Sequence, residues 1–239
     1  MFIPLKDENP TYRVPYITGL LISLNILVFL YQALSSQGLQ LSVLTMGVIP
    51  YEITHFTSVS GIPRLSPPLT LLTSMFMHGG IFHLLSNMLY LWIFGNNVED
   101  YLGHGRFALF YLVCGIGAAM AHIVFHPGSI VPMVGASGAI AGILGAYFLL
   151  YPRARVLTLI FIWLIPVPAA VILGVWFVSQ LLNVGLQGGV AWLAHIGGFL
   201  IGMIWIRAVI RSRKTVTNGR ETEWYGGNWE VVEEDRSDI

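Results

Sequence analysis

Long apolar stretches with almost no charged residues follow one another along this chain. Five of them are residues 14–34, 81–98, 107–125, 133–151 and 190–210. Each approaches the ~20 apolar residues that a helix needs to cross the hydrocarbon core of a bilayer. Only 10% of the 239 residues are charged and 55% are hydrophobic, whereas soluble domains have about 25% charged residues. We therefore expect a polytopic membrane protein, which excludes a disordered chain, a nucleic-acid binder and an ordinary soluble enzyme.

One further uncharged segment, residues 156–186, does not fit a single crossing. At 31 residues it is too long for one upright helix and too short for two helices joined by a turn. Pro166 and Pro168 divide it, because proline breaks a helix interior. We expect residues 156–165 to lie in the membrane interface and residues 167–186 to form a crossing. The total is then six crossings, and both termini lie on the same side.

The distribution of Lys and Arg predicts the orientation, because cytoplasmic loops of membrane proteins carry an excess of these residues. With the N-terminus in the cytoplasm, eleven of the twelve basic residues lie inside and only Arg64 lies outside. We expect a cytoplasmic N-terminus (1–13), a membrane domain (14–210) and a polar, poorly ordered cytoplasmic tail (211–239). The first stretch is not read as a signal peptide, since no small-x-small cleavage site closes it, and the lack of a transit peptide favours a bacterial plasma membrane.

Four uncharged polar side chains stand out in the predicted crossings, where polar groups are costly and usually functional. In this topology His83, Asn87, Ser137 and His195 all lie in the outer part of the membrane, at similar depth. His83 and Asn87 are four residues apart, so they share one helix face. Each alone has a plainer explanation, such as a hydrogen bond between helices. Together they supply a nucleophile, a base and hydrogen-bond donors, which are the parts of a serine hydrolase site.

Ser137 lies at a predicted helix start, within the sequence GASG. The first N–H groups of a helix have no internal partners and carry the positive end of its dipole, so they can hold an oxyanion. Gly138 begins a face of small residues at helical spacing, and Gly198 and Gly202 form a second such face after His195. Small residues let helices approach closely, so packing the two faces together is expected to bring His195 to Ser137.

Carboxylates are absent from the part of the sequence that contains these residues. No Asp or Glu occurs between Tyr101 and Ile206, and Glu99 and Asp100 lie at the cytoplasmic end of the second crossing. A Ser-His-Asp triad is therefore not expected, and a Ser-His dyad is what the sequence allows. A His-Glu-x-x-His zinc motif and a pair of membrane-embedded aspartates are also absent from the sequence, so we expect no metal and no cofactor.

Four ordered motifs resemble those of the rhomboid family of intramembrane serine proteases. They are HGGIFHLLSN at 78–87, GNNVED at 95–100 followed by Gly103, GASGA at 135–139 and AHIGG at 194–198. The resemblance covers about residues 67–206. It implies an all-α polytopic membrane protein, with a six-helix rhomboid-like bundle and a long outer loop between helices 1 and 2.

The resemblance also implies a role for each matching residue. Ser137 would be the nucleophile and His195 the general base, and His83, Asn87 and the Ser137 backbone N–H would form an oxyanion hole. Glu99 would be a structural residue near the cytoplasmic end of the second crossing. Apart from the resemblance, we expect Gly135, Gly138, Gly198 and Gly202 to be structural glycines.

The implied function is that of a serine endopeptidase that cleaves transmembrane segments of membrane-protein substrates by a Ser-His dyad. Its partners would be those substrates and the lipid bilayer, with no nucleic acid and no metal, and its site would open to the outer side. One departure concerns Ala141, because relatives often carry an aromatic residue there that stacks on the catalytic histidine. How His195 is oriented is therefore open.

Two other functions remain as alternatives. The first is a non-catalytic rhomboid-like protein that holds transmembrane helices, although this chain keeps both Ser137 and His195. The second is a haem or metal membrane protein that uses His78, His83, His122 and His195.

Overall fold

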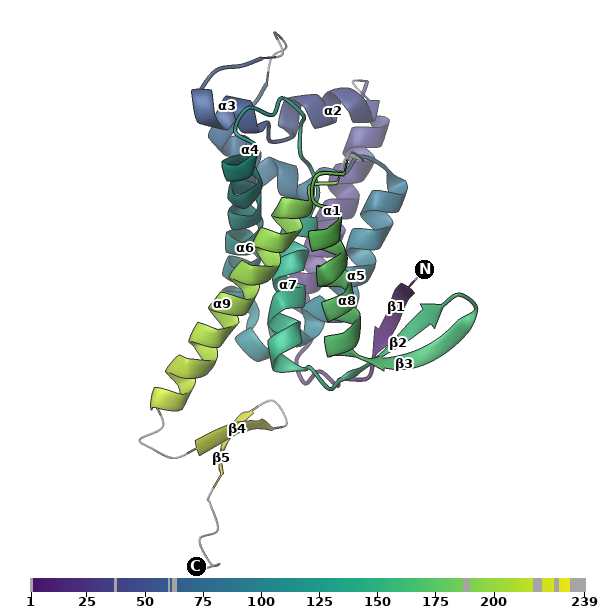
Figure 1. Cartoon of the computed structure of the whole chain (residues 1–239), viewed down its shortest axis with the longest axis vertical. Helices are drawn as coiled ribbons and strands as arrows, with labels where there is room; N and C mark the ends of the chain where they lie inside the picture. The colour runs from purple at the N-terminus through teal and green to yellow at the C-terminus, as the bar shows by residue number, and fades with distance from the viewer. Residues whose placement is uncertain are drawn as a thin grey trace, which may run out of the picture.

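The computed structural model describes residues 2–36, 38–59, 61, 64–186, 190–216, 221–225 and 228–232. The chain forms a mostly helical bundle with short helices at one end and a small sheet near the other (Figure 1). The main helices are α1 (Tyr16–Leu34), α5 (Ile81–Leu102), α6 (His104–Phe125), α7 (Ser137–Leu150), α8 (Ala169–Leu182) and α9 (Trp192–Val216).

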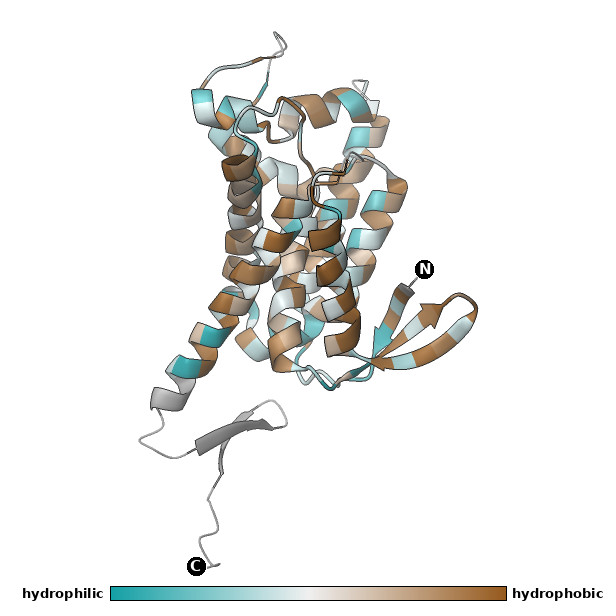
Figure 2. Cartoon of the chain, in the orientation of Figure 1, coloured by the Kyte–Doolittle hydropathy of each residue, from teal (hydrophilic) through white to brown (hydrophobic). Residues whose placement is uncertain are grey.

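Several of these helices have the length and composition of membrane spans. Among the described residues, α1, α6 and α9 are each long and apolar enough to cross a bilayer. A fourth candidate is α5 together with the short helices α4 (Pro67–Thr73) and η1 (Ser74–Phe76), which meet it at a bend of 77°. The helices α7 and α8 are apolar but have only 14 residues each. Figure 2 shows apolar residues on the outward faces of the bundle, as expected for a polytopic membrane protein, while the number of six crossings stays a prediction.

The helix α7 lies at the centre of the bundle, packed against α5, α6, α8 and α9. Ten consecutive residues, from Gly138 to Tyr147, are buried, which is typical of a helix that is apolar all round. A Cβ atom at Gly198 or Gly202 of α9 would overlap the carbonyl oxygens of Gly138 and Gly142. The two faces of small residues therefore meet with their backbones in contact, which only glycine permits.

The acidic pair at the end of α5 binds the start of α1. The Glu99 carboxylate accepts hydrogen bonds from the backbone N–H of Ile17 (2.9 Å) and from the backbone and hydroxyl of Thr18 (both 2.7 Å). His104 lies 2.6 Å from the same carboxylate. Asp100 accepts two further backbone N–H groups just before α1. The first N–H groups of a helix lack internal partners and favour an anion, so Glu99 holds α1 against α5.

A three-stranded antiparallel sheet lies beside one end of the bundle (Figure 1). Its strands are β1 (Phe2–Asp7), β2 (Arg155–Ile160) and β3 (Trp163–Pro168), in the order β1-β2-β3. This sheet corrects the expectation of an all-α chain. The physical reason is that residues 156–165 are rich in the β-branched and aromatic residues that strands favour, and that β1 lies too far away in the sequence to leave a local signal.

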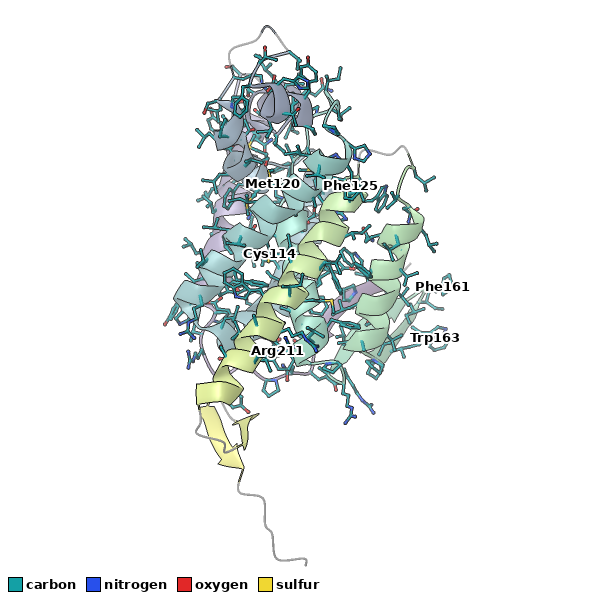
Figure 3. All side chains as sticks on the ribbon, turned by 60° about the vertical axis from the view of Figure 1, so that its left-hand side comes forward. Cys114, Met120, Phe125, Phe161, Trp163 and Arg211 are labelled. Atoms are coloured by element: carbon teal, nitrogen blue, oxygen red, sulfur yellow. The ribbon has the colours of Figure 1, made fainter. Side chains whose placement is uncertain are left out.

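The turn between β2 and β3 exposes large apolar side chains. Phe161 is 78% exposed and Trp163 is 67% exposed, and both point away from the bundle (Figure 3). Pro166 and Pro168 lie in β3, an edge strand, where a missing N–H is tolerated. The location of residues 156–165 in the membrane interface stays a prediction.

The long outer loop predicted between the first two crossings contains short helices. They are α2 (Gly38–Met46), α3 (Pro50–His55) and the start of α4. Arg64 and Glu52, both nearly inaccessible to solvent, form an ion pair of 3.1 Å, and Arg64 also donates to the carbonyl oxygen of Gly47 (2.9 Å). Burial lowers the pKa of Arg64 below its usual value, and the Glu52 carboxylate opposes that shift. Arg64 therefore ties the segment after α3 both to α3, through Glu52, and to the segment after α2, through Gly47.

The last helix of the bundle is longer than predicted. The helix α9 continues to Val216, beyond the expected end of the last crossing at residue 210. Two short strands, β4 (Glu221–Tyr225) and β5 (Asn228–Val232), pair antiparallel. Residues 217–220, 226–227 and 233–239 of the predicted tail lie outside the described residues, so the expected poor order of 211–239 stays a prediction.

Candidate active site

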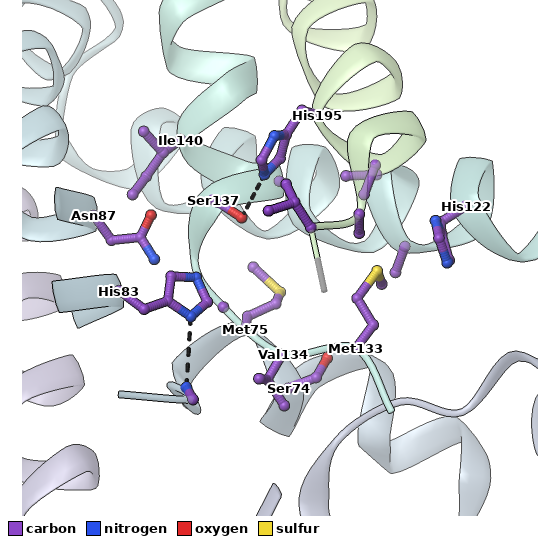
Figure 4. A pocket seen from close by; sticks show the side chains of 18 of the residues that line it. Ser74, Met75, His83, Asn87, His122, Met133, Val134, Ser137, Ile140 and His195 are labelled. Atoms are coloured by element: carbon purple, nitrogen blue, oxygen red, sulfur yellow. Dashed lines mark hydrogen bonds between the residues drawn. The ribbon is translucent and has the colours of Figure 1, made fainter. Parts of the chain in front are cut away.

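Ser137 and His195 come from different helices and lie within hydrogen-bonding distance of each other. The Oγ atom of Ser137, the first residue of α7, is 2.8 Å from Nε2 of His195 in the first turns of α9 (Figure 4). The close contact between α7 and α9 produces this approach, because Gly198 lies on the same helix just after His195 and packs on the carbonyl of Gly138. Both polar side chains are half-buried.

The backbone before Ser137 turns sharply into α7. Gly135 has a φ of +125°, a conformation that favours glycine, and its N–H donates to the carbonyl oxygen of Ser74 (2.9 Å). Ala136 is the N-cap, and its carbonyl accepts the first helical bond from Ile140 N–H. The N–H groups of Ser137 and the next two residues therefore precede the helical hydrogen-bond pattern. They are donors at the positive end of the α7 dipole, next to the Ser137 hydroxyl.

His83 and Asn87 lie on α5, on the same side of the cavity as each other (Figure 4). A Cβ atom at Gly135 would lie 2.8 Å from the His83 ring and 3.6 Å from Ser137 Oγ, so the ring borders the serine. The backbone N–H of Gly79 approaches Nδ1 of His83 at 3.5 Å. The structure therefore brings all four predicted polar residues around one space.

His78, which precedes α5 and is predicted only as a ligand of the metal alternative, is a buried partner of Asn87. Nδ2 of Asn87 lies 3.0 Å from Nε2 of His78 and donates to it. The backbone of His78 is held by Gln32 of α1, which accepts from its N–H (3.0 Å) and donates to its carbonyl (3.3 Å). A side-chain amide has two N–H bonds. The contact with His78 therefore fixes the orientation of Asn87 and leaves its second N–H to donate to another acceptor.

Gln180 of α8 is a residue that the sequence reasoning missed. Its Oε1 atom lies 2.7 Å from Nδ1 of His195, on the opposite side of the ring from Ser137. Trp176, one turn earlier on α8, has its ring centroid 5.8 Å from that of His195. The available signal was a glutamine inside an otherwise apolar predicted crossing, because uncharged polar residues in such segments are often functional.

A cavity of about 1270 Å³ joins the four polar residues predicted from the sequence. His83, Asn87, Ser137 and His195 all line it, and His122 of α6 lies on its wall. Cavities of this size accept part of a polypeptide or a large ligand. A serine hydroxyl beside an imidazole and helix N-terminal N–H groups, on such a cavity, is an arrangement that can support acyl transfer.

Of the histidines of the metal alternative, His83, His122 and His195 line the cavity but do not form one cluster. The rings of His78 and His83 lie 5.1 Å apart, whereas His122 stacks on His126 at 4.8 Å. Within the part of the chain that the structure describes, no group of three or more His, Cys, Asp or Glu side chains is arranged to hold a metal ion.

Comparisons with known proteins place this chain in a family. A family model described as "Rhomboid domain" matches residues 67–212. "Rhomboid protease GluP" of Bacillus subtilis (strain 168) is 40% identical over 134 residues, which cover 55% of this chain and 24% of that protein. "RHOMBOID-like protein 1" of Arabidopsis thaliana is 34% identical over 143 residues, which cover 56% of this chain and 32% of that protein.

A mitochondrial relative has a similar overlap. "Rhomboid protein 1, mitochondrial" of Saccharomyces cerevisiae is 30% identical over 149 residues, which cover 57% of this chain and 40% of that protein. The chain spans about a quarter to two fifths of the length of these three relatives. The matched model extends over more than half of this chain and includes every helix that contributes to the cavity walls from α5 to α9. The chain therefore belongs to the rhomboid family.

Proposed function

We propose that this protein is an intramembrane serine endopeptidase that cleaves transmembrane segments of membrane-protein substrates. The observation that carries the proposal is the 2.8 Å contact between Ser137 Oγ and His195 Nε2 on the wall of a large cavity. Family membership supports it, since one relative is described as a rhomboid protease. No cofactor or metal enters the proposed reaction.

In the proposed mechanism, Ser137 Oγ attacks the carbonyl carbon of the scissile peptide bond while His195 Nε2 takes its proton. The resulting imidazolium gives that proton to the leaving amine, and an acyl-enzyme remains on Ser137. His195 then takes a proton from water as the water attacks the ester carbonyl, and it returns this proton to Ser137 Oγ when the ester bond breaks and the product acid leaves. The tetrahedral oxyanion of each step would be held by the Ser137 N–H, His83 and the second N–H of Asn87.

We propose that the cavity opens to the outer side of the membrane, with six crossings (α1, α5, α6, α7, α8 and α9) and both termini in the cytoplasm. The support is the positive-inside distribution of the basic residues and the length of α7. Fourteen residues give α7 a length of about 21 Å, against a hydrocarbon core of about 30 Å. Ser137 at the start of so short a helix would lie below the membrane surface, where a cavity is needed to admit water.

Covalent labelling with a fluorophosphonate probe tests the proposal in native membranes. We expect wild-type protein to be labelled and to cleave a model transmembrane substrate, and Ser137→Ala to do neither. His195→Ala is expected to lose at least the ~10²–10⁴-fold that general-base catalysis contributes. Ser23→Ala is the matched control, because the Ser23 hydroxyl is exposed and donates only to the preceding turn of α1.

Equal cleavage by wild type and Ser137→Ala would contradict the proposal. Wild-type protein that binds transmembrane helices but is neither labelled nor active would favour the alternative of a non-catalytic helix-binding protein. A chelator is expected to leave cleavage unchanged, which tests metal chemistry separately.

A further inference from the structure

The side-chain amide of Gln180 contacts the ring nitrogen of His195 that does not face Ser137. Gln180 is only 4% exposed, although it lies on the apolar helix α8. Its Oε1 atom is 2.7 Å from Nδ1 of His195. Its Nε2 atom donates to the carbonyl oxygen of Trp176 (3.0 Å) and to Oγ of Ser179 (2.9 Å). Both ends of this buried amide therefore have partners.

These partners determine which way the amide faces. A carbonyl oxygen can only accept a hydrogen bond, so the end of Gln180 next to the Trp176 carbonyl must be the NH₂ group. The Ser179 hydroxyl donates to that same carbonyl (2.6 Å), so its oxygen is free to accept from the amide. The end that faces His195 is consequently the amide oxygen.

The orientation of the amide in turn determines the tautomer of His195. An amide oxygen only accepts, so Nδ1 of the imidazole must carry the hydrogen that joins them. A neutral imidazole has one N–H, which leaves Nε2 unprotonated. Nε2 is the nitrogen that faces Ser137 Oγ, and an unprotonated nitrogen there is what a general base requires.

We propose that Gln180 is the positioning residue of the dyad, which fixes the tautomer and the ring orientation of His195. This rests on the proposed function of Ser137 and His195. In a Ser-His-Asp triad a buried carboxylate has this role, but a carboxylate inside a membrane bundle is costly. A neutral amide supplies the acceptor without that charge. It also accounts for how the ring is held although residue 141 is alanine, with Trp176 of the same helix lying beside the ring.

Two substitutions separate the acceptor from the bulk of the side chain. Gln180→Met keeps an unbranched chain of similar volume but removes the acceptor, and we expect kcat to fall by about 10- to 100-fold with KM within about twofold. Gln180→Glu keeps an acceptor, so we expect kcat to stay within about tenfold of wild type. Because a carboxylate stabilises the imidazolium, the acid limb of its pH–rate profile is expected to move to higher pH. Asn183→Leu, another amide substitution at the end of α8, is the matched control.

A spectroscopic measurement tests the tautomer directly, in the full-length protein in detergent or nanodiscs. In ¹⁵N-histidine-labelled protein, with the His195 signals assigned by their loss in His195→Gln, we expect a protonated Nδ1 and an unprotonated Nε2 in wild type. Gln180→Met is expected to show the other tautomer or a mixture. An unchanged tautomer together with unchanged kcat in Gln180→Met would overturn the inference, as would equal losses in the Met and Glu variants.

The same experiments distinguish this failure from failure of the proposed function. If wild type and Asn183→Leu are labelled by the fluorophosphonate and Ser137→Ala is not, the dyad stands whatever Gln180→Met shows. If wild type is not labelled, the proposed function fails, and the ¹⁵N spectrum still reports whether Gln180 sets the tautomer.

Discussion

Replacing Glu99 with glutamine tests how α1 is held against α5. The carboxylate accepts the N–H of Ile17 at one oxygen and the N–H and hydroxyl of Thr18 at the other, and His104 lies 2.6 Å from the first oxygen. Glutamine turns one of these oxygens into an NH₂ group, which cannot accept. Whichever way the amide is oriented, one backbone N–H of α1 then faces another donor and loses its partner.

The expected loss of stability follows from the number and kind of these bonds. A hydrogen bond to a charged group contributes about 1.5–3 kcal/mol, and leaving a buried donor unpaired adds to the cost. The variant loses one such bond and weakens the rest by removing the charge, so we expect a loss of about 3–5 kcal/mol. For a chain of 239 residues this lowers Tm by about 6–20 °C.

Thermal unfolding can be followed by a thiol-reactive fluorophore, because Cys114 is the one cysteine of the chain and is buried in α6. Glu8→Gln is the matched control, since Glu8 is exposed, and its Tm is expected to stay within about 2 °C of wild type. A Tm for Glu99→Gln that also stays within about 2 °C would refute the reasoning that this carboxylate anchors α1.

Three further predictions concern other parts of the molecule. Gly198→Ala places a Cβ on a carbonyl oxygen of α7, so we expect a loss of about 1–3 kcal/mol in stability and weaker labelling of Ser137, whereas Gly19→Ala, with open space around it, should leave both intact. Burial raises the pKa of Asp7 above 3.8, so the folded protein favours the protonated carboxyl. The contribution of this group to stability is fully present below pH 3.8 and is lost as the pH rises through the raised pKa. Asp7→Asn should therefore flatten the dependence of Tm on pH in that range. Quenching of Trp163 fluorescence, measured as the difference between wild type and Trp163→Phe, should be stronger with lipids brominated near the headgroup than at the chain end, and equal quenching would contradict an interfacial location.

Apolar length predicts most of the helices, because a crossing leaves a signal in every one of its residues. It is least accurate for α7 and α8, expected over residues 133–151 and 167–186 but only 14 residues long each. Hydropathy continues past their ends, whereas backbone geometry stops the helices. Gly135 turns the chain just before α7, and Pro168 is the N-cap of α8. Helix boundaries of this kind depend on local conformation and not on composition.

The approach of His195 to Ser137 is predictable because both residues lie beside faces of small residues whose spacing can be read directly. Their partners are not predictable in the same way. Gln180 is visible in the sequence as a polar residue in an apolar segment, but which side of α8 faces the dyad is decided by tertiary packing. The contact of Glu99 with Thr18 joins positions 81 residues apart, and nothing local in either segment indicates it.

The pairing of β1 with β2 sets an order for the biosynthesis of the protein. The two strands are separated by about 150 residues. At about 5–20 residues per second, the ribosome needs about 8–30 s to make the intervening chain, and β1 has no strand to pair with during that time. The sheet therefore closes only after α1, α5, α6 and α7 have been synthesised. Its formation joins a segment made before these helices to a helical assembly that already contains Ser137.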